Sequence, residues 1–137
     1  MAEKERRTRK RGLISAVVAL AVLVFPVQSE GSPVLRYGPE YQTCNLKPTV
    51  EIVACVQDHT KVWDTRLNSA YKELRARLPD RRKVILRDAQ RLWIKYRDAN
   101  CEYYYSREGS LKQIEVAECL RVMTAARALE LEAELRP

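Results

Sequence analysis

From Thr49 onward, apolar residues recur at steps of three and four positions, and this pattern is interrupted only at Pro79-Asp80 and at Glu108-Gly109. Steps of three and four place apolar side chains on one face of an α-helix, whereas a strand needs an alternation of two. The sequence therefore predicts three amphipathic helices. Because short connections make neighbouring helices antiparallel, we expect an all-α, up-down-up three-helix bundle.

The first helix is expected over about residues 49–78 and the second over about residues 80–107, since proline is tolerated in the first turn of a helix. Ser110 and Gln113 match a capping box at the start of the third helix. The stripes expected to face the core are Trp63, Leu67, Ala70, Tyr71, Leu74 and Leu78 in the first helix, Leu86, Ala89, Trp93 and Tyr96 in the second, and Leu111, Ile114, Ala117, Leu120, Thr124 and Leu131 in the third.

Residues 1–29 have the layout of a secretory signal peptide. Basic residues predominate in 1–11, an uncharged apolar run occupies 13–27, and small polar residues follow. Val27 and Ser29 fit the −3 and −1 positions of a cleavage site, so we expect cleavage after Ser29. The alternative is an uncleaved signal anchor, although the run is shorter than the roughly 20 residues of a membrane-spanning helix. We expect an exported protein, periplasmic or secreted, without stable membrane insertion once the signal is cleaved.

The formal charge of +7 resides mainly in this segment. Residues 1–29 hold six basic and two acidic residues, and their removal leaves a charge of +3. A mixed-charge surface of this kind does not indicate a nucleic-acid partner. One histidine, His59, and four glycines leave little material for relay catalysis or phosphate-binding loops. We therefore predict a binding protein with no enzymatic activity and no cofactor.

The four cysteines lie at positions 44, 55, 101 and 119. An even number in a small exported domain is typical of disulfides, and the spacing does not match the paired C-x-x-C pattern of a zinc site. We expect no metal, and free thiols are the remaining alternative. Of the three connectivities, we favour sequential pairing, Cys44 with Cys55 and Cys101 with Cys119, because each pair brackets an expected turn.

An irregular arm is predicted over residues 30–48, before the first helix. This segment holds two glycines and three prolines, which interrupt both helical and strand patterns. Cys44 would pin the arm to the rest of the domain.

Three blocks of the helical region carry a resemblance to a known family. The blocks are Asp64-x-x-Leu67-Asn68-x-x-Tyr71, then Ala89-Gln90-Arg91-x-Trp93-Ile94-x-Tyr96-Arg97-Asp98-Ala99-x-Cys101, then Gly109-Ser110, Cys119 and Thr124-x-x-Arg127. Over about residues 44–131 the chain resembles the LprI-like lysozyme-inhibitor family of small exported bacterial proteins, so residues 49–137 would form an LprI-like helical domain. The resemblance implies a disulfide-bonded helical protein without catalytic residues. One departure is Glu108-Gly109-Ser110, where the family more often has Gly-Gly-Ser.

The polar residues of these blocks predict a structural network along the helix seams. Partly buried charges at such seams are usually paired, so we expect Arg97 or Arg127 to pair with Asp64 across the bundle. Neighbouring side chains would supply the remaining donors and acceptors. The expected network comprises Asp64, Asn68, Tyr71, Gln90, Arg97, Asp98, Thr124 and Arg127.

A candidate partner-binding site lies at the end of the second helix, in Tyr103, Tyr104, Tyr105 and Arg107. Consecutive helical residues point about 100° apart, so three adjacent tyrosines cannot all face one core. The alternative is that Tyr103 or Tyr104 caps the core. Exposed tyrosine beside arginine is typical of protein interfaces. Two classes of binding partner fit this sequence.

The first partner is lysozyme, whose cleft this loop would plug. The second is another component of the cell envelope, either a protein or an anionic polymer. That component would bind basic helix faces such as Arg81, Arg82, Lys83 and Arg87, although a solvated charged helix face is the more ordinary explanation of this cluster.

Overall fold

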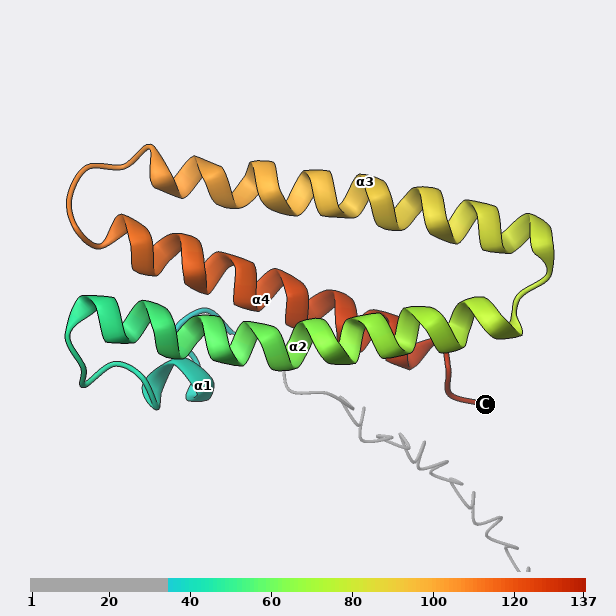
Figure 1. Cartoon of the computed structure of the whole chain (residues 1–137), viewed down its shortest axis with the longest axis horizontal. Coiled ribbons are helices and arrows are strands. Elements are labelled where there is room, and N and C mark those ends of the chain that lie inside the picture. Colours follow the sequence, from blue (N-terminus) through green and yellow to red (C-terminus); the bar gives the residue numbers. More distant parts are fainter. Residues whose placement is uncertain (1–34) are drawn as a thin grey trace, which may run out of the picture. The chain divides into compact units, whose positions relative to one another are not determined.

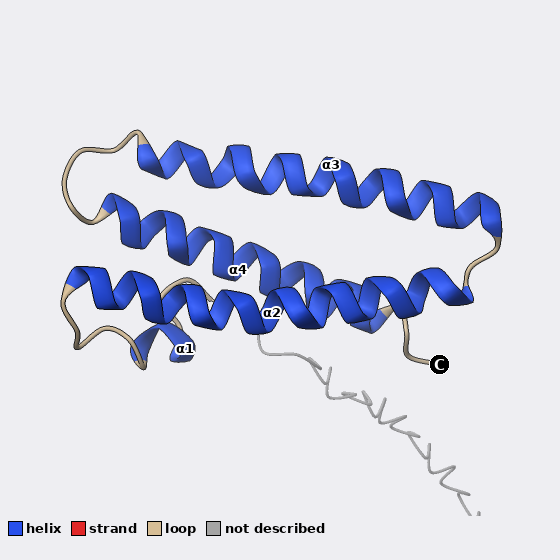
Figure 2. Ribbon diagram, viewed as in Figure 1, coloured by secondary structure: helices blue, strands red, loops and turns tan. Residues whose placement is uncertain are grey.

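A computed structural model describes residues 35–137, which form an up-down-up helical bundle (Figures 1 and 2). The expected signal peptide and the first part of the arm lie outside the described residues. The helices are α1 (Pro39–Gln42), α2 (Thr49–Arg77), α3 (Asp80–Tyr105) and α4 (Lys112–Ala133). The predicted all-α fold is confirmed, and the long helices end within two residues of the expected positions. The short helix α1 interrupts a segment that was expected to be irregular throughout.

The C-terminal helix α4 is the centre of the bundle. Helix α2 packs along α4, and α3 packs on α4 as well (Figure 1). The residues that α4 buries are spread around its circumference: Ile114, Ala117, Glu118, Cys119, Arg121, Thr124, Ala125, Ala128 and Leu131. A helix buried on most sides is a core helix, so α2 and α3 are the outer layers of this domain.

The apolar core has two clusters, one near each end of the bundle. The first contains Cys44, Ile52, Val56, Ile114 and Ala117, and the second contains Leu67, Ala70, Leu74, Ala128 and Leu131. Trp63, Tyr71, Leu78, Leu86 and Trp93 pack against the second cluster. The stripe predicted along the first long helix therefore does face the core.

The stripe predicted for the second long helix is only half right. Leu86 and Trp93 pack on the core, but Ala89 and Tyr96 are exposed. The physical reason is that α3 packs mainly on α4, so it buries a narrow face and leaves its other faces in solvent. Its buried residues are Gln90 and Cys101, of which the first is polar.

The capping box expected at the third helix does not form. Helix α4 has Leu111 as its N-cap residue, without a side-chain hydrogen bond, and Leu111 is itself exposed. Gly109 adopts a φ of 92°, a left-handed conformation that glycine reaches at little cost. The turn built on this glycine delays the start of the helix, so Ser110 does not occupy the N-cap position.

The two disulfides pair Cys44 with Cys55 and Cys101 with Cys119, as sequential pairing predicts. The first joins the arm to α2, and the second joins α3 to α4. Because Cys101 lies about one turn before the end of α3 and Cys119 about two turns after the start of α4, the second bond fixes the base of that hairpin.

A buried ion pair on α4 holds the arm against the bundle. Arg121 is 2% exposed and Glu118 is fully buried. Arg121 Nε donates to Glu118 Oε2 at 2.8 Å, and Arg121 Nη2 donates to Glu118 Oε1 at 2.6 Å. These hydrogen bonds raise the pKa of Arg121. A bidentate pair of this kind offsets part of the cost of removing both charges from water.

The arm supplies the remaining partners of this pair. Arg121 Nη2 donates to the carbonyl oxygen of Leu35 at 2.9 Å, and Arg121 Nη1 donates to the carboxylate of Glu40 in α1. The backbone N–H of Tyr37 donates to Glu118 Oε1 at 2.7 Å. The indole N–H of Trp63 in α2 donates to both oxygens of Glu40, at 2.9 and 3.0 Å. The arm, α2 and α4 are therefore joined through one polar centre.

We predict that Arg121→Met lowers the free energy of unfolding by about 3–5 kcal/mol, because it leaves Glu118 as a buried charge without a counter-charge. Glu118→Met should cost less, because Arg121 keeps the carboxylate of Glu40. The double substitution should cost clearly less than the sum of the two. Urea unfolding of the oxidised protein measures all three. The exposed pair of Asp58 and Lys61 is the control, and its double replacement by Met should leave the stability nearly unchanged. Additive losses at Glu118 and Arg121 would contradict the predicted coupling.

Candidate functional site

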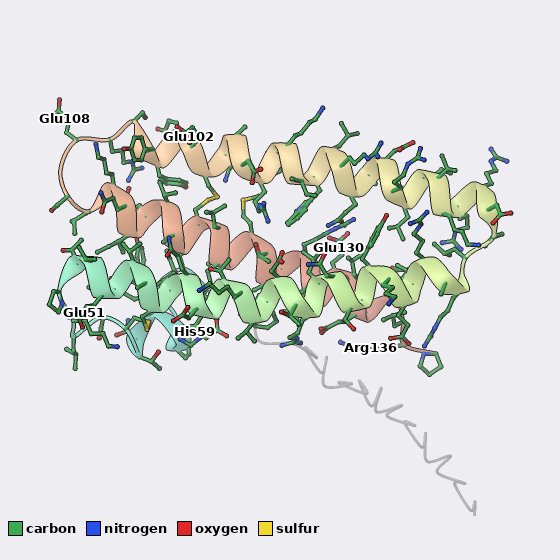
Figure 3. All side chains as sticks on the ribbon, in the orientation of Figure 1. Glu51, His59, Glu102, Glu108, Glu130 and Arg136 are labelled. Carbon is green, nitrogen blue, oxygen red and sulfur yellow. A yellow bond between two sulfur atoms is a disulfide. The ribbon has the colours of Figure 1, made fainter. Side chains whose placement is uncertain are left out.

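One end of the bundle exposes aromatic and basic side chains around the loop between α3 and α4. Tyr103 is 65% exposed, Tyr105 is 51% exposed and Leu111 is also exposed. Figure 3 shows Glu108 pointing outward from this loop. We call Tyr103, Tyr105, Arg107 and Leu111 the tip surface. Of the four residues predicted to bind a partner, three belong to this surface.

The fourth predicted residue, Tyr104, is half-buried and supports the tip. Its ring meets the ring of Tyr103 edge-on, with 5.5 Å between the centroids. The guanidinium of Arg36 lies 4.2 Å from the Tyr104 centroid, and that of Arg107 lies 5.0 Å from it. Cation–π contacts at these distances hold both arginines against the ring. Tyr104 therefore orients the tip, while its neighbours face solvent.

Arg107 is tied across the loop to α4. Its Nη1 donates to both carboxylate oxygens of Glu115 at 3.0 Å. The carbonyl oxygen of Glu115 accepts a hydrogen bond from Arg36 Nη2 at 3.1 Å. The Arg107 side chain is still half exposed, so its remaining N–H groups face solvent. A partner would thus meet an arginine that is already positioned.

Most of the predicted polar network lines an open groove between α2 and α3. The groove has a volume of about 420 Å³. It is lined by Asp64, Leu67, Asn68, Tyr71 and Arg75 from α2 and by Arg87, Gln90, Arg91, Trp93, Ile94 and Arg97 from α3. Residues of the two most specific sequence blocks therefore lie together on one surface.

The contacts around this groove differ from those expected. Asp64 is exposed and accepts a hydrogen bond from Asn68 at 3.0 Å. Arg97 pairs with its neighbour Asp98 at 2.8 Å, and Arg127 pairs with Glu130. The expected ion pair between Asp64 and either arginine is not among those formed within residues 35–137. For Arg97 the reason is that α2 and α3 both pack on α4, which leaves a groove between Asp64 and Arg97, and Arg127 is instead held by Gln90 and Glu130.

Two members of the network lie beside the groove, on α4. Arg127 Nε donates to Gln90 Oε1 at 3.0 Å, and this is the contact that links α4 to α3 in the network. Thr124 is buried, and its hydroxyl has no hydrogen-bond partner among the described residues. The predicted network is therefore replaced by separate contacts, each of which joins only two of its residues.

The groove is cationic and partly aromatic. Four arginines and Asp64 line it, and the guanidinium of Arg97 lies 5.1 Å from the Trp93 ring centroid. Arg87 pairs with Asp88 and Arg97 pairs with Asp98, so Arg75 and Arg91 supply most of the excess positive charge. Most of these residues belong to the sequence blocks that carry the family resemblance. Because they lie beside the apolar stripes, the sequence predicted that they would be buried. The separation of α2 from α3 is a tertiary feature that the spacing does not contain.

A third cluster contains Cys44, Cys55 and His59. Their side-chain ligand atoms lie within 4.8 Å of one another. Both sulfur atoms are bonded to each other in the disulfide, and Thr43 Oγ1 lies 3.1 Å from His59 Nε2. A zinc site needs thiolates, so these residues do not form one while the disulfide is present.

Among the described helices, none has the length and apolar character needed to cross a membrane. The two disulfides fit a protein that is exported to an oxidising compartment.

The fold and its two disulfides define a small, disulfide-bonded, all-helical domain. A model of the family described as lysozyme inhibitor LprI matches residues 43–131, so the chain belongs to the LprI lysozyme-inhibitor family. The chain is also 27% identical over 116 residues to an uncharacterized protein of Rhizobium meliloti (strain 1021), a match that covers 74% of this chain and 84% of the relative. No solved structure matches the chain.

We predict that Glu115→Gln frees Arg107 and loosens the loop, because a neutral amide loses the charge-assisted hydrogen bonds. Limited trypsin digestion of the oxidised protein, read by mass spectrometry, should show cleavage after Arg107 that is several-fold faster. Glu51→Gln, at an exposed position of α2, is the control and should leave the rate unchanged. Equal cleavage rates in the wild type and Glu115→Gln would show that the ion pair does not order the loop.

Proposed function

We propose that this protein is an exported lysozyme inhibitor that acts by protein–protein binding through its tip surface. Membership of the LprI family supports lysozyme as the class of partner. The observation that carries the proposal is the clamped Arg107, which lies beside the exposed ring of Tyr103 at the tip. The protein acts by binding and catalyses no reaction.

The chemistry of the tip suits an enzyme cleft that contains carboxylates. Lysozymes cleave glycosidic bonds with a pair of carboxyl side chains. Arg107 offers free N–H donors to such a carboxylate, while Tyr103 and Tyr105 supply large rings that lose little conformational entropy on binding. The disulfide between Cys101 and Cys119 keeps the base of the loop rigid, which lowers the ordering cost of association.

The net charge of the protein indicates which forces would stabilise its complex with lysozyme. The chain from residue 30 onward carries +3, and animal-type lysozymes are usually basic, so long-range attraction does not assist their encounter. Recognition then depends on short-range contacts that slow dissociation. Inhibition of this kind should weaken little as salt rises.

Cell-wall lysis assays with animal-type and bacterial-type lysozymes test the proposal, with exported, oxidised protein produced from the full chain. We expect saturable inhibition of at least one class. Arg107→Ala and the double variant Tyr103→Ala/Tyr105→Ala should each raise the inhibition constant by about ten-fold or more, as expected for interface hot spots.

The matched control is Lys61→Ala/Val62→Ala, which alters exposed residues of α2 outside the tip surface. It should inhibit like the wild type. Absence of inhibition at micromolar protein with every lysozyme tested would refute the proposed function. Inhibition that the tip variants leave unchanged would keep lysozyme as the partner but exclude the tip as its binding surface.

The groove between α2 and α3 supports a second candidate function, the binding of an anionic polymer of the cell envelope. Four arginines beside Trp93 and Tyr71 offer charge for carboxylates or phosphates and rings for sugar faces. Arg87 is shared by this groove and the basic cluster at the start of α3, which also contains Arg81, Arg82 and Lys83. Binding here would be mainly ionic.

We predict that polygalacturonate, which has one carboxylate per sugar, binds the protein at low salt and that neutral dextran does not. Because screening shortens to about 3 Å at 1 M salt, the affinity should fall steeply with salt. Arg75→Gln/Arg91→Gln should weaken binding several-fold in titrations that follow tryptophan fluorescence. Lys47→Gln/Lys61→Gln removes the same charge elsewhere and should bind more tightly than the groove variant. Equal affinities of the two variants would exclude the groove as the binding site.

A further inference from the structure

Helix α3 carries a second apolar stripe that nothing in the described fold covers. The stripe consists of Ile85, Ala89, Leu92, Tyr96 and Ala99, which follow one another at steps of four and three. The three large side chains are 59% (Ile85), 67% (Leu92) and 62% (Tyr96) exposed, and both alanines are exposed as well. We call these five residues the outer stripe. Alternating steps of three and four are the spacing by which one helix packs along another.

From Leu92 to Ala99 the outer stripe faces away from α2, whereas Ile85 and Ala89, near the hairpin, share a depression with Leu74 of α2. The α3 residues that line the groove beside α2 include Arg91 and Ile94. Leu92 and Ile94 are two positions apart, which places them about 200° apart around the helix. A helix that docks on the outer stripe would therefore stay clear of the groove and would approach α2 only at the hairpin end, beside Leu74.

The charged residues beside the outer stripe alternate in sign. Arg81, Asp88, Lys95 and Glu102 occupy one flank at intervals of seven, and all four are exposed. The opposite flank faces the bundle and carries Leu86 and Trp93. In an antiparallel helix pair, equivalent flanks of the two helices face each other, so this charged edge would meet its own copy.

One antiparallel register matches every opposite charge on this edge. When Ala89 faces Leu92 of a second copy and Ile85 faces its Tyr96, Asp88 lies beside the second copy's Lys95. In the same register, Arg81 lies beside the second copy's Glu102, and the two-fold symmetry doubles both pairs. A shift of seven residues would instead bring Lys95 against Lys95 and Asp88 against Glu102. The charge pattern thus favours one alignment and opposes its neighbour.

A hollow next to the stripe fits the same arrangement. Ile85 and Ala89 line a depression of about 270 Å³, together with Leu74, Leu86 and Leu131. In the favoured register, Tyr96 of the second copy packs on Ile85 at the edge of this hollow. Burial of an aromatic ring beside an apolar depression stabilises association.

We propose that two copies of this chain form a symmetric dimer through antiparallel packing of their α3 helices along the outer stripe. The interface leaves Arg107, Tyr105 and the groove between α2 and α3 accessible. Asp88 already accepts a hydrogen bond from Arg87 of its own helix, and its carboxylate has further acceptor capacity for the second copy's lysine. Tyr103 follows Ala99 at a step of four and so lies at the end of the same stripe, and the dimer thereby presents Arg107 and Tyr105 of both copies.

Sedimentation equilibrium of the exported, oxidised protein, from micromolar to submillimolar concentration, tests the proposal. We expect reversible dimerisation. Leu92→Glu should raise the dimer dissociation constant by about ten-fold or more, because it places a charge in the interface core. Leu92 is exposed, so the melting temperature at low concentration should not change. Val62→Glu introduces the same charge at an exposed position of α2 and should dimerise like the wild type.

Charge exchange tests the register. Lys95→Asp should weaken the dimer, because it sets Asp88 against a like charge, and Asp88→Lys/Lys95→Asp should restore it. A chain that stays monomeric throughout the concentration range, or a dimer that Leu92→Glu leaves intact, would overturn the proposal. A double variant that is no stronger than Lys95→Asp would overturn the antiparallel register.

Discussion

The bidentate pair between Arg121 and Glu118 is the interaction on which the arrangement of this domain depends. Both charges lie in the middle of the protein, where an unpaired charge is costly, so each needs the other and the surrounding donors and acceptors. Those additional groups come from the backbone of the arm and from Glu40, which in turn binds Trp63 of α2. Burial of one ion pair therefore requires the arm, α2 and α4 to meet in a single geometry.

The central position of α4 explains the surfaces that remain available for binding. Since α2 and α3 both pack on α4, the space between them stays open as a groove, and most of the circumference of α3 stays in solvent. Arginines line the groove, and an apolar stripe follows the outer face of α3. The tip surface lies at the end of α3 and on the loop that joins α3 to α4, away from the groove. The central position of α4 thus leaves three chemically distinct surfaces exposed, which are the groove, the outer stripe and the tip surface.

The helices themselves could be predicted because helix formation is a local property of the sequence. The repeat of three and four and the breaks at Pro79 and Gly109 placed the ends of the long helices within two residues. Sequential pairing of the cysteines also follows from local order, because each pair brackets one turn. The stripe on α3 was half wrong, since apolar periodicity does not say how many neighbours a helix has. Ala89 and Tyr96 fit the pattern and are nevertheless exposed.

The sequence was enough to define an all-α, disulfide-bonded domain, its family resemblance and the residues from which the tip and groove are built. Only the tertiary structure decided which of these residues are buried, paired or open to solvent. Glu118 and Arg121 are three positions apart on a helix and look like an ordinary surface pair, yet the arm covers them. Asp64 and Arg97 look like partners across a seam, yet the groove lies between their helices. Burial and pairing depend on contacts between segments far apart in the chain, and periodicity along one helix carries no information about them.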